Sequence, residues 1–286
     1  MATEKKMTTS LIRKKKEQGT PITMVTAYDF PSAKLVEEAG VDMILVGDSL
    51  GMAVLGYDST IPVTMEEMIH HTKAVTRAVK RSFVVADLPF LSYHKSVEEA
   101  VSNAGRLMQE GLAKAVKMEG GSELAPIIIR CVQAGIPVVG HIGLTPQAVH
   151  QLGGYKVQGR DLAQAKKLLA DAIALQEAGV FALVLECVPE EVARLITKEL
   201  EIPVIGIGAG AACDGQVLVF HDLLGYASQI TPSFVKRYAD VGGTIRDAVT
   251  AYIRDVEARA FPGPEHVFHA SDETIKHLYG EGEGES

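Results

Sequence analysis

Short apolar runs rich in β-branched residues alternate with longer helical patterns along most of this chain. The runs predict strands at Ile22–Ala27, Met43–Val46, Phe83–Ala86, Ala115–Met118, Val138–Gly140, Ala182–Leu185, Val204–Ile207 and Val217–Phe220. Helical patterns fill 31–39, 64–80, 96–110, 122–134, 161–178 and 189–199. Because strands that are buried on both faces are nearly all apolar, this alternation predicts a parallel sheet covered by helices, in the α/β class.

Eight strands predict a closed (β/α)8 TIM barrel, and an open doubly wound sheet is the alternative. The loop after the first strand reads AYDFPSAK and lacks the GxGxxG of doubly wound nucleotide-binding sheets. No linker interrupts the pattern, so we expect a single domain over 1–262 and an extended, partly disordered C-terminal tail over 263–286. Residues 8–18 predict an extra N-terminal helix that could close the bottom of the barrel.

Capping signals support these helices. Ser96 is followed by Glu99, and Thr64 by Glu67, at the spacing of a capping box. The segments EEAGVD, QEGLAK, QAGIPV and QEAGVF each place glycine just past a predicted helix. We expect these glycines to end their helices in the left-handed conformation.

Composition excludes several classes of protein. The net charge of −8 over 286 residues gives no electrostatic reason to bind nucleic acid or an anionic membrane. The basic run 13–16 is interpreted as the solvated face of a short helix. No stretch approaches the ~20 apolar residues that span a bilayer, and the first thirty residues lack a signal-peptide core, so a soluble, cytoplasmic protein is expected.

Three widely spaced cysteines, Cys131, Cys187 and Cys213, exclude a disulfide framework and a CxxC metal site. Cys187 follows a predicted strand end, so it is a candidate nucleophile. No histidine or cationic residue adjoins it in sequence to activate it, and reduced, unreactive thiols are the simpler interpretation.

Charged residues stand where five of the predicted strands stop. They are Asp48, Asp87, Glu119, His141 and Glu186. The carboxyl ends of the strands in a parallel barrel meet at one mouth, where active sites lie. Unpaired carboxylates and an imidazole are costly to bury together. A divalent cation and a catalytic base at this mouth would explain all five.

Asp48, Asp87 and Glu119 follow three successive strands and are therefore neighbours around the mouth. Oxygen ligands without a histidine pair or cysteine favour Mg²⁺ over zinc. Taken singly, each of these residues could instead be a helix N-cap or a loop ion pair.

Lys117 lies two residues before Glu119, so the two share a face of their strand. Lys117 could clamp an anionic substrate or form a structural ion pair. Ser49 begins a glycine-rich segment whose hydroxyl and amides could hold a substrate carboxylate.

Glu186 lies apart from the three carboxylates and follows an apolar strand, so it is a candidate general base, or else a fourth metal ligand. His141 could polarise a substrate oxygen or serve only the structure. The segment GIGAGAACDGQ could bind phosphate, as in flavin or sugar-phosphate enzymes, but no clear helix start follows it.

A metal beside a carboxylate base suggests one reaction class. A 2-oxo acid chelates Mg²⁺ through its carboxylate and keto oxygens, and the metal stabilises the enolate formed when the base removes the adjacent proton. The enolate can then attack an electrophilic carbon, or the reverse reaction can break a bond.

Several segments together resemble the ketopantoate hydroxymethyltransferase family: MVTAYDFPSAKLVEEAGVDMILVGDSLGMAVLGYDSTIPVTMEEM, ADLPF, AVKMEGG, GHIGLTPQ, GGYKVQGR, LVLECVP and GIGAGAACDGQVLVFHDLLG. The resemblance runs in register from residue 8 to about residue 262, without a departure at a functional position. It implies a cytoplasmic, Mg²⁺-dependent TIM barrel, a homo-oligomer that is usually a decamer. The implied reaction transfers a one-carbon unit from 5,10-methylenetetrahydrofolate to 3-methyl-2-oxobutanoate. The product is 2-dehydropantoate, in the first committed step of pantothenate synthesis.

The resemblance also implies roles for individual residues. Asp48 and Asp87 would bind Mg²⁺ directly and Glu119 would complete the metal site. The 2-oxo acid would contact Asp48, Ser49, Asp87 and Lys117, with His141 near the substrate and Glu186 as the proton acceptor. Two alternatives remain, a Mg²⁺-dependent 2-oxo acid lyase or mutase of the phosphoenolpyruvate type and a non-catalytic metabolite-binding barrel. The cysteine-bearing lid of the former is not found in the sequence, and the latter would be expected to lose its base.

Overall fold

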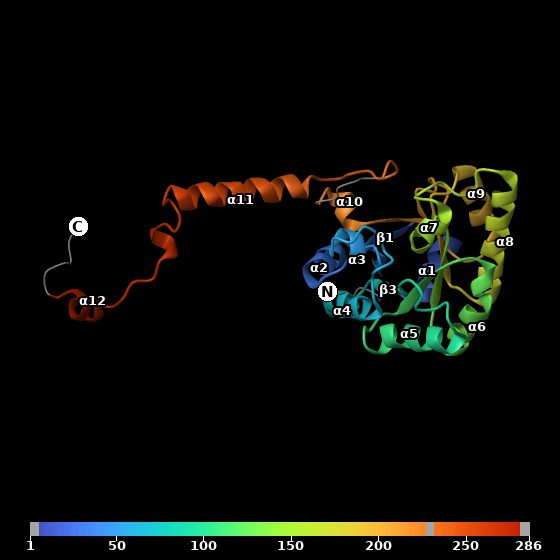
Figure 1. The fold of residues 1–286 in the computed structure, drawn as a ribbon, viewed down its shortest axis with the longest axis horizontal. Coiled ribbons are helices and arrows are strands. Elements are labelled where there is room, and N and C mark those ends of the chain that lie inside the picture. The colour runs from blue at the N-terminus through green and yellow to red at the C-terminus, as the bar shows by residue number, and fades with distance from the viewer. Residues whose placement is uncertain (1–5, 227–231, 281–286) are drawn as a thin grey trace. The chain divides into compact units, whose positions relative to one another are not determined.

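The computed structural model of the protein describes residues 6–226 and 232–280. Eight strands in these residues form a closed parallel barrel in chain order, which confirms the predicted TIM barrel (Figure 1). The strands are β1 (Ile22–Thr26), β2 (Met43–Val46), β3 (Phe83–Asp87), β4 (Ala115–Glu119), β5 (Val138–Gly143), β6 (Ala182–Glu186), β7 (Val204–Ile207) and β8 (Gly215–Leu218). The barrel closes where β8 pairs with β1, with Ile22 opposite Gly215.

Helices follow most strands. They are α1 (Thr9–Glu17), α2 (Phe30–Glu38), α3 (Leu50–Ala53), α4 (Met65–Ala78), α5 (Val97–Gln109), α6 (Ala125–Gln133), α7 (Val149–Leu152), α8 (Leu162–Ala178), α9 (Glu190–Glu199), α10 (Phe220–Leu224), α11 (Val241–Glu257) and α12 (Asp272–Tyr279). Short 3₁₀ turns are η1 (Ser122–Leu124), η2 (Pro146–Ala148) and η3 (Pro264–His266).

Side chains alternate along each strand between the barrel interior and the layer beneath the helices. On β2, Met43 and Leu45 belong to the cluster that fills the barrel. Ile44 and Val46 between them belong to the larger cluster that packs against the helices. Strands β2, β3 and β4 are therefore buried on both faces, which is why they appear in the sequence as mainly apolar runs, whereas β1 and β8 each expose one outward residue, Thr23 and Gln216.

Helix α1 closes the bottom of the barrel, as predicted. Ile12 is fully buried in the interior cluster. The ammonium of Lys15 lies 2.6 Å from Asp42, and that of Lys16 lies 2.8 Å from Asp214. Both acids directly precede strands of the barrel. The interpretation of the basic run as a solvated face is therefore wrong for these two lysines, because each neutralises a partly buried carboxylate.

The predicted capping box at Thr64 is confirmed, since Thr64 and Glu67 hydrogen bond to each other's backbone amides. At Ser96 the prediction is half right. Its hydroxyl accepts a hydrogen bond from the Glu99 amide at 3.1 Å. The Glu99 carboxylate turns instead to Lys95, at 3.1 Å.

Among the four glycines expected to be left-handed, Gly111 is the exception. Gly40, Gly135 and Gly179 have positive φ, but after α5 it is Leu112 that takes the left-handed conformation, with φ 62°. A Cβ atom on Gly111 would lie 2.8 Å from Thr72 of α4. Glycine is needed there for close helix packing and not for its φ angle.

The last strand begins two positions earlier than predicted, at Gly215, and α10 begins at Phe220. The segment 208–214 leads from β7 directly into β8 with no helix between them. A helix N-terminus to hold a phosphate is therefore absent from this described segment.

The chain divides into two units, Met1–Ala239 and Asp240–Ser286. The first contains the barrel, and the second contains α11 and α12. Neither helix was predicted, and α12 lies in the tail that was expected to be extended. Asp240 caps α11 and Ser271 caps α12. The predicted domain boundary after residue 262 stays a prediction. No helix in the described parts of the chain is long and apolar enough to cross a membrane.

Candidate active site

The period of two along the strands carries polar side chains into the barrel mouth. On β3 the inward residues Phe83 and Val85 are followed by Asp87. On β4 the inward residue Ala115 is followed by Lys117 and Glu119. By the same alternation His141 and Glu186 point inward from β5 and β6. The predicted strand-end residues therefore meet at the barrel mouth, where their side chains contact one another directly.

Lys117 lies at the centre of this group. Its ammonium is 3.2 Å from Asp87 Oδ1, 3.5 Å from Glu119 Oε1 and 3.1 Å from His141 Nδ1. Only 4% of its side chain is exposed. Burial alone would lower the pKa of Lys117, but the carboxylates of Asp87 and Glu119 outweigh it and raise that pKa. Lys117 is therefore a permanent cation at the mouth.

Glu119 and His141 face each other across two strands. Glu119 Oε1 lies 3.4 Å from His141 Nδ1, and their backbones are paired in register. Burial raises the pKa of Glu119, but Lys117 and His141 outweigh it and lower that pKa to about 2. Burial and Lys117 lower the pKa of His141, whereas Glu119 and Glu186 raise it, for a net rise to about 9.

Asp48 and Asp87 form an adjacent pair. The Asp48 amide donates a hydrogen bond to Asp87 Oδ2 at 3.1 Å, and both side chains are buried. Burial and the charges of Glu119 and Asp87 raise the pKa of Asp48 well above its usual value. Gly47 permits this approach, because a Cβ atom there would lie 2.8 Å from Ser49 Oγ and 3.4 Å from Asp87 Oδ2.

Gln147 was missed by the sequence reasoning. It is buried, donates from Nε2 to Asp48 Oδ2 at 2.8 Å, and donates from its backbone amide to Glu119 Oε2 at 3.0 Å. Tyr93 donates to Gln147 Oε1 at 2.8 Å. The only signal for Gln147 is its place in the GHIGLTPQ segment, four residues beyond the end of β5 at Gly143.

Tyr28 was also missed. Its hydroxyl lies 2.8 Å from Ser49 Oγ, and its side chain is almost completely buried. Burial raises the pKa of Tyr28, so the hydroxyl stays protonated. Tyr28 therefore orients the Ser49 hydroxyl, which is only half-buried and can be reached from the mouth.

Glu186 is the most accessible of the strand-end carboxylates. Its side chain is 16% exposed, compared with 3% for Asp87 and Glu119, so its surroundings are less dry than the apolar strand suggested. Glu186 Oε2 lies 3.3 Å from His141 Nε2, yet that nitrogen is buried and forms no hydrogen bond with the described residues. Of the two groups, the Glu186 carboxylate is the more exposed.

The donor set fits a hard cation with few protein ligands. Asp87 Oδ1 is buried and accepts no hydrogen bond from the described residues, although Lys117 lies beside it. Both oxygens of Glu119 already face other groups. No group of three or more His, Cys, Asp or Glu within 6–226 and 232–280 is arranged to hold a metal. Mg²⁺ usually takes one or two carboxylates and completes its shell with water and substrate oxygens, as Asp48 and Asp87 would allow.

Cys187 is not an activated nucleophile. Burial and the neighbouring Glu186 raise its pKa to about 11, so it is a neutral thiol at ordinary pH. Its backbone is left-handed, with φ 48°.

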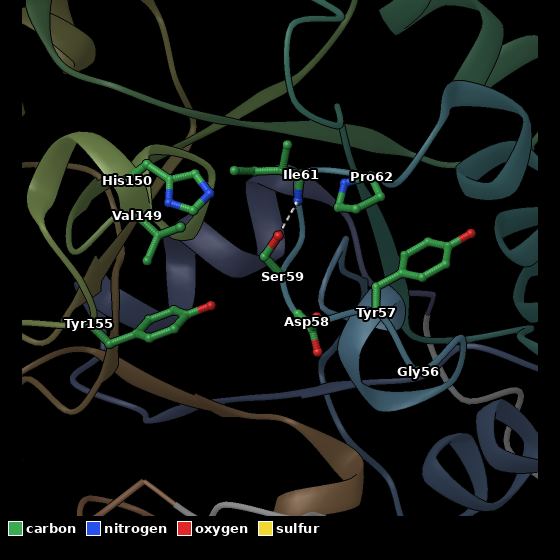
Figure 2. Close-up of a pocket in the computed structure, with 9 residues that line it drawn as sticks. All are labelled: Gly56, Tyr57, Asp58, Ser59, Ile61, Pro62, Val149, His150 and Tyr155. Atoms are coloured by element: carbon green, nitrogen blue, oxygen red, sulfur yellow. Dashed lines mark hydrogen bonds between the residues drawn. The ribbon is translucent and has the colours of Figure 1, made fainter.

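Two cavities lie among the loops that follow the strands. One, of 660 Å³, has Glu119, Tyr93 and Gln147 in its wall. The other, of 760 Å³, is bounded by residues 56–62 after α3 and by Val149, His150 and Tyr155 (Figure 2). Ile61 and His150 line both cavities, so the second cavity adjoins the first.

Comparison with known proteins gives a family. The family model for ketopantoate hydroxymethyltransferase matches residues 6–264. A protein of Thermoanaerobacter sp. (strain X514), named 3-methyl-2-oxobutanoate hydroxymethyltransferase, is 60% identical over 93% of this chain and 97% of its own length. Proteins of the same name from Carboxydothermus hydrogenoformans and Geobacillus kaustophilus are 57% and 60% identical over 96% and 94% of this chain, and 99% and 96% of their own lengths.

Solved structures of other proteins resemble this chain in fold. A putative phosphonomutase from Burkholderia cenocepacia J2315 has a TM-score of 0.62 at 16% identity, over 86% of this chain and 98% of its own. A phosphonopyruvate hydrolase, solved with oxalate and Mg²⁺, has a TM-score of 0.56 at 17% identity, over 96% and 95%. At such low identity these likenesses show a shared barrel fold alone. The sequence matches over nearly the whole chain go further, and the chain belongs to the ketopantoate hydroxymethyltransferase family of enzymes.

Proposed function

We propose that this enzyme transfers a hydroxymethyl unit from 5,10-methylenetetrahydrofolate to 3-methyl-2-oxobutanoate and forms 2-dehydropantoate, the first committed step of pantothenate biosynthesis. The observation that carries the proposal is about 60% identity, over nearly the whole chain, to relatives named for this reaction. The site geometry supports it, because carboxylates, one ammonium and one imidazole meet at a mouth that a small 2-oxo acid can enter.

Asp48 and Asp87 would hold Mg²⁺, and Glu119 would complete the site. A bound Mg²⁺ would supply a Lewis acid that stabilises negative charge on the oxygens of the 2-oxo acid. Asp87 Oδ1 supports this assignment, since it is a buried oxygen that accepts no hydrogen bond from the part of the chain that the structure describes. The carboxylates of the group also exceed its cations in number, and a divalent cation would offset that excess.

Lys117 and Ser49 would bind the 2-oxo acid. Lys117 is a buried cation, so it attracts the carboxylate of the substrate. The half-buried Ser49 hydroxyl, oriented by Tyr28, can hydrogen bond to the same carboxylate. His141 would donate from its unpartnered Nε2 to a substrate oxygen.

Glu186 would remove the proton from C3 of the 2-oxo acid. It is more exposed than the other strand-end carboxylates, and its Oε2 lies 3.3 Å from His141 Nε2. Water and 5,10-methylenetetrahydrofolate would together supply the one-carbon unit at the oxidation level of formaldehyde, with cleavage of its bonds to the folate nitrogens and release of tetrahydrofolate. The carbanion equivalent at C3 would then bond to that carbon, and its oxygen would take up a proton to become the hydroxyl group. The adjoining cavity of 760 Å³ gives the larger folate room beside the site (Figure 2).

We further propose a cytoplasmic homo-oligomer, with the decamer as the expected form. The proposal rests on membership of the family, and its partners are the two small-molecule substrates.

The test measures two reactions of the wild-type enzyme with Mg²⁺. In D₂O without folate, NMR should show exchange of the C3 proton of 3-methyl-2-oxobutanoate, and with 5,10-methylenetetrahydrofolate the enzyme should form 2-dehydropantoate. Asp48→Ala and Asp87→Ala should abolish both reactions, whereas Glu177→Gln, on the exposed side of α8, should change neither. Exchange without folate-dependent product would contradict the transferase assignment and favour a lyase.

A further inference from the structure

Gln147 links the carboxylates of two strands that are not adjacent in the barrel. Its side-chain nitrogen donates to Asp48 Oδ2 at 2.8 Å, beyond the end of β2. Its backbone amide donates to Glu119 Oε2 at 3.0 Å, at the end of β4. The same side-chain nitrogen donates to the carbonyl of Leu88 at 2.9 Å, just past β3. One residue from the loop after β5 therefore ties together three strand ends.

The network permits one orientation of the Gln147 amide. Both hydrogens on Nε2 face oxygens, from Asp48 and Leu88, and Oε1 accepts a hydrogen bond from Tyr93 at 2.8 Å. Turning the amide over would place Oε1 against the Leu88 carbonyl, which can only accept. All three side-chain bonds are buried, so breaking any of them leaves a polar group without a partner.

This orientation decides which carboxylate oxygens remain for a ligand. Gln147 occupies Oδ2 of Asp48, so Oδ1, which accepts no hydrogen bond from the described residues, is the oxygen left for a ligand. Asp87, which accepts the Asp48 amide through Oδ2, likewise keeps Oδ1 without a hydrogen bond from the described residues. Oδ2 of each aspartate is thus engaged by a hydrogen bond, whereas Oδ1 of each accepts none from the described residues and, in Asp87, lies 3.2 Å from the Lys117 ammonium.

We propose that Gln147 is a positioning residue that presents the Asp48 carboxylate to the divalent cation. The inference rests on the proposed function, because it assigns the cation to Asp48 and Asp87. Residues that hydrogen bond to metal ligands fix the ligand geometry, and their loss typically weakens metal binding by about 10- to 100-fold.

The test compares Gln147→Met with Gln176→Met, using Mn²⁺ as the probe cation and no substrate. Methionine keeps the length of glutamine and removes its hydrogen bonds. Gln176 is the control, because it lies on α8, outside the group of mouth residues, and its Oε1 accepts hydrogen bonds from the amides of Glu201 and Ile202 in the segment between α9 and β7. Electron paramagnetic resonance of free Mn²⁺ should give a Kd raised about 10- to 100-fold for Gln147→Met and unchanged for Gln176→Met. Both variants should lower the melting temperature.

Tyr93→Phe provides a second variant if Gln147→Met does not fold. It removes the hydroxyl that holds Gln147 Oε1, and it should raise the Kd for Mn²⁺ by a smaller factor. A wild-type Kd in a folded Gln147→Met protein, or an equal rise in Gln176→Met, would overturn the positioning role. Failure of the wild-type protein to bind Mn²⁺ or Mg²⁺ would instead contradict the proposed function.

Discussion

Lys117 and His141 contact carboxylates from three different strand ends, and burial amplifies each of these interactions. The surroundings do not shift the pKa of every acid in the same direction. Glu119 faces both cations directly and its pKa falls, whereas Asp48 has carboxylates for neighbours and its pKa rises. Neighbouring residues of one chemical type therefore differ in proton affinity, which acid–base chemistry requires.

The substitution Glu186→Gln tests whether Glu186 is the general base that removes the C3 proton. The amide keeps the shape of the side chain and cannot accept the C3 proton. We expect near-normal binding of Mg²⁺ and of 3-methyl-2-oxobutanoate, and loss of folate-independent C3 exchange by a factor on the order of 10² or more. Deuterium exchange followed by NMR makes the measurement. Exchange at the wild-type rate, with turnover lost, would transfer the role of base to His141 or to water.

His141 predicts a pH dependence of stability. Its pKa rises from 6.5 to about 9 on folding, so its stabilisation is fully present below pH 6.5 and is lost as the pH rises through 9. In EDTA, the free energy of unfolding of the wild type should fall by at most ~3 kcal/mol more than that of His141→Gln over this interval. Urea titrations at pH 6.5 and 9.5 provide the comparison, and parallel losses in both proteins would refute the assignment.

At the level of elements, the strands were the predictable part. Their residues face the barrel on one side and the helices on the other, so the burial of both faces appears directly in the local sequence. The period of two then also places Lys117 beside Glu119. These local rules held for the buried strands, whereas β8, whose Gln216 is exposed, was predicted two positions too late.

Gln147, Tyr93 and Tyr28 could not be found in this way. They lie outside the strands, and their contacts join residues far apart in sequence, such as Gln147 with Asp48, 99 positions away. Gly111 shows the same limit, because its need for glycine comes from Thr72 on another helix. Tertiary packing, which no local pattern contains, decides these positions.

Helix α1 predicts a stability effect that is separate from catalysis. Ile12 is fully buried in the barrel interior, so Ile12→Ala should lower the free energy of unfolding by ~2–5 kcal/mol. Ile129, on α6, is 41% exposed, and Ile129→Ala should cost far less. Denaturant titration of both variants makes the comparison. Equal losses would show that α1 does not close the barrel.

For the whole molecule, the second unit, Asp240–Ser286, is relevant to the proposed assembly of subunits. Along α11, Ile245, Val249, Tyr252, Ile253 and Val256 recur at helical spacing and are each more than 40% exposed. Such an apolar stripe on a helix is usually buried against another surface. It is consistent with the proposed homo-oligomer.

The substitution Val249→Asp tests whether the apolar stripe on α11 is part of the contact between subunits. A charge within the stripe should oppose burial of the stripe and shift the protein from the expected decamer of 30.6 kDa chains toward smaller species. Thr250→Asp adds the same charge one position away from the stripe and should leave the mass unchanged. Light scattering after size exclusion measures both, and identical masses for the two variants would exclude α11 from the assembly contact.

The closure at the bottom of the barrel also fixes an order of events during biosynthesis. Lys16 is made early, yet its partner Asp214 lies 198 positions later, and β1 must likewise wait for β8. At typical translation rates of ~5–20 residues per second, the first helix therefore stays without its final contacts for tens of seconds. Until β8 has been made, Ile12 lacks the complete barrel interior that buries it in the native structure. A short basic helix that precedes the whole barrel in the chain is thus among the last elements to gain its native contacts.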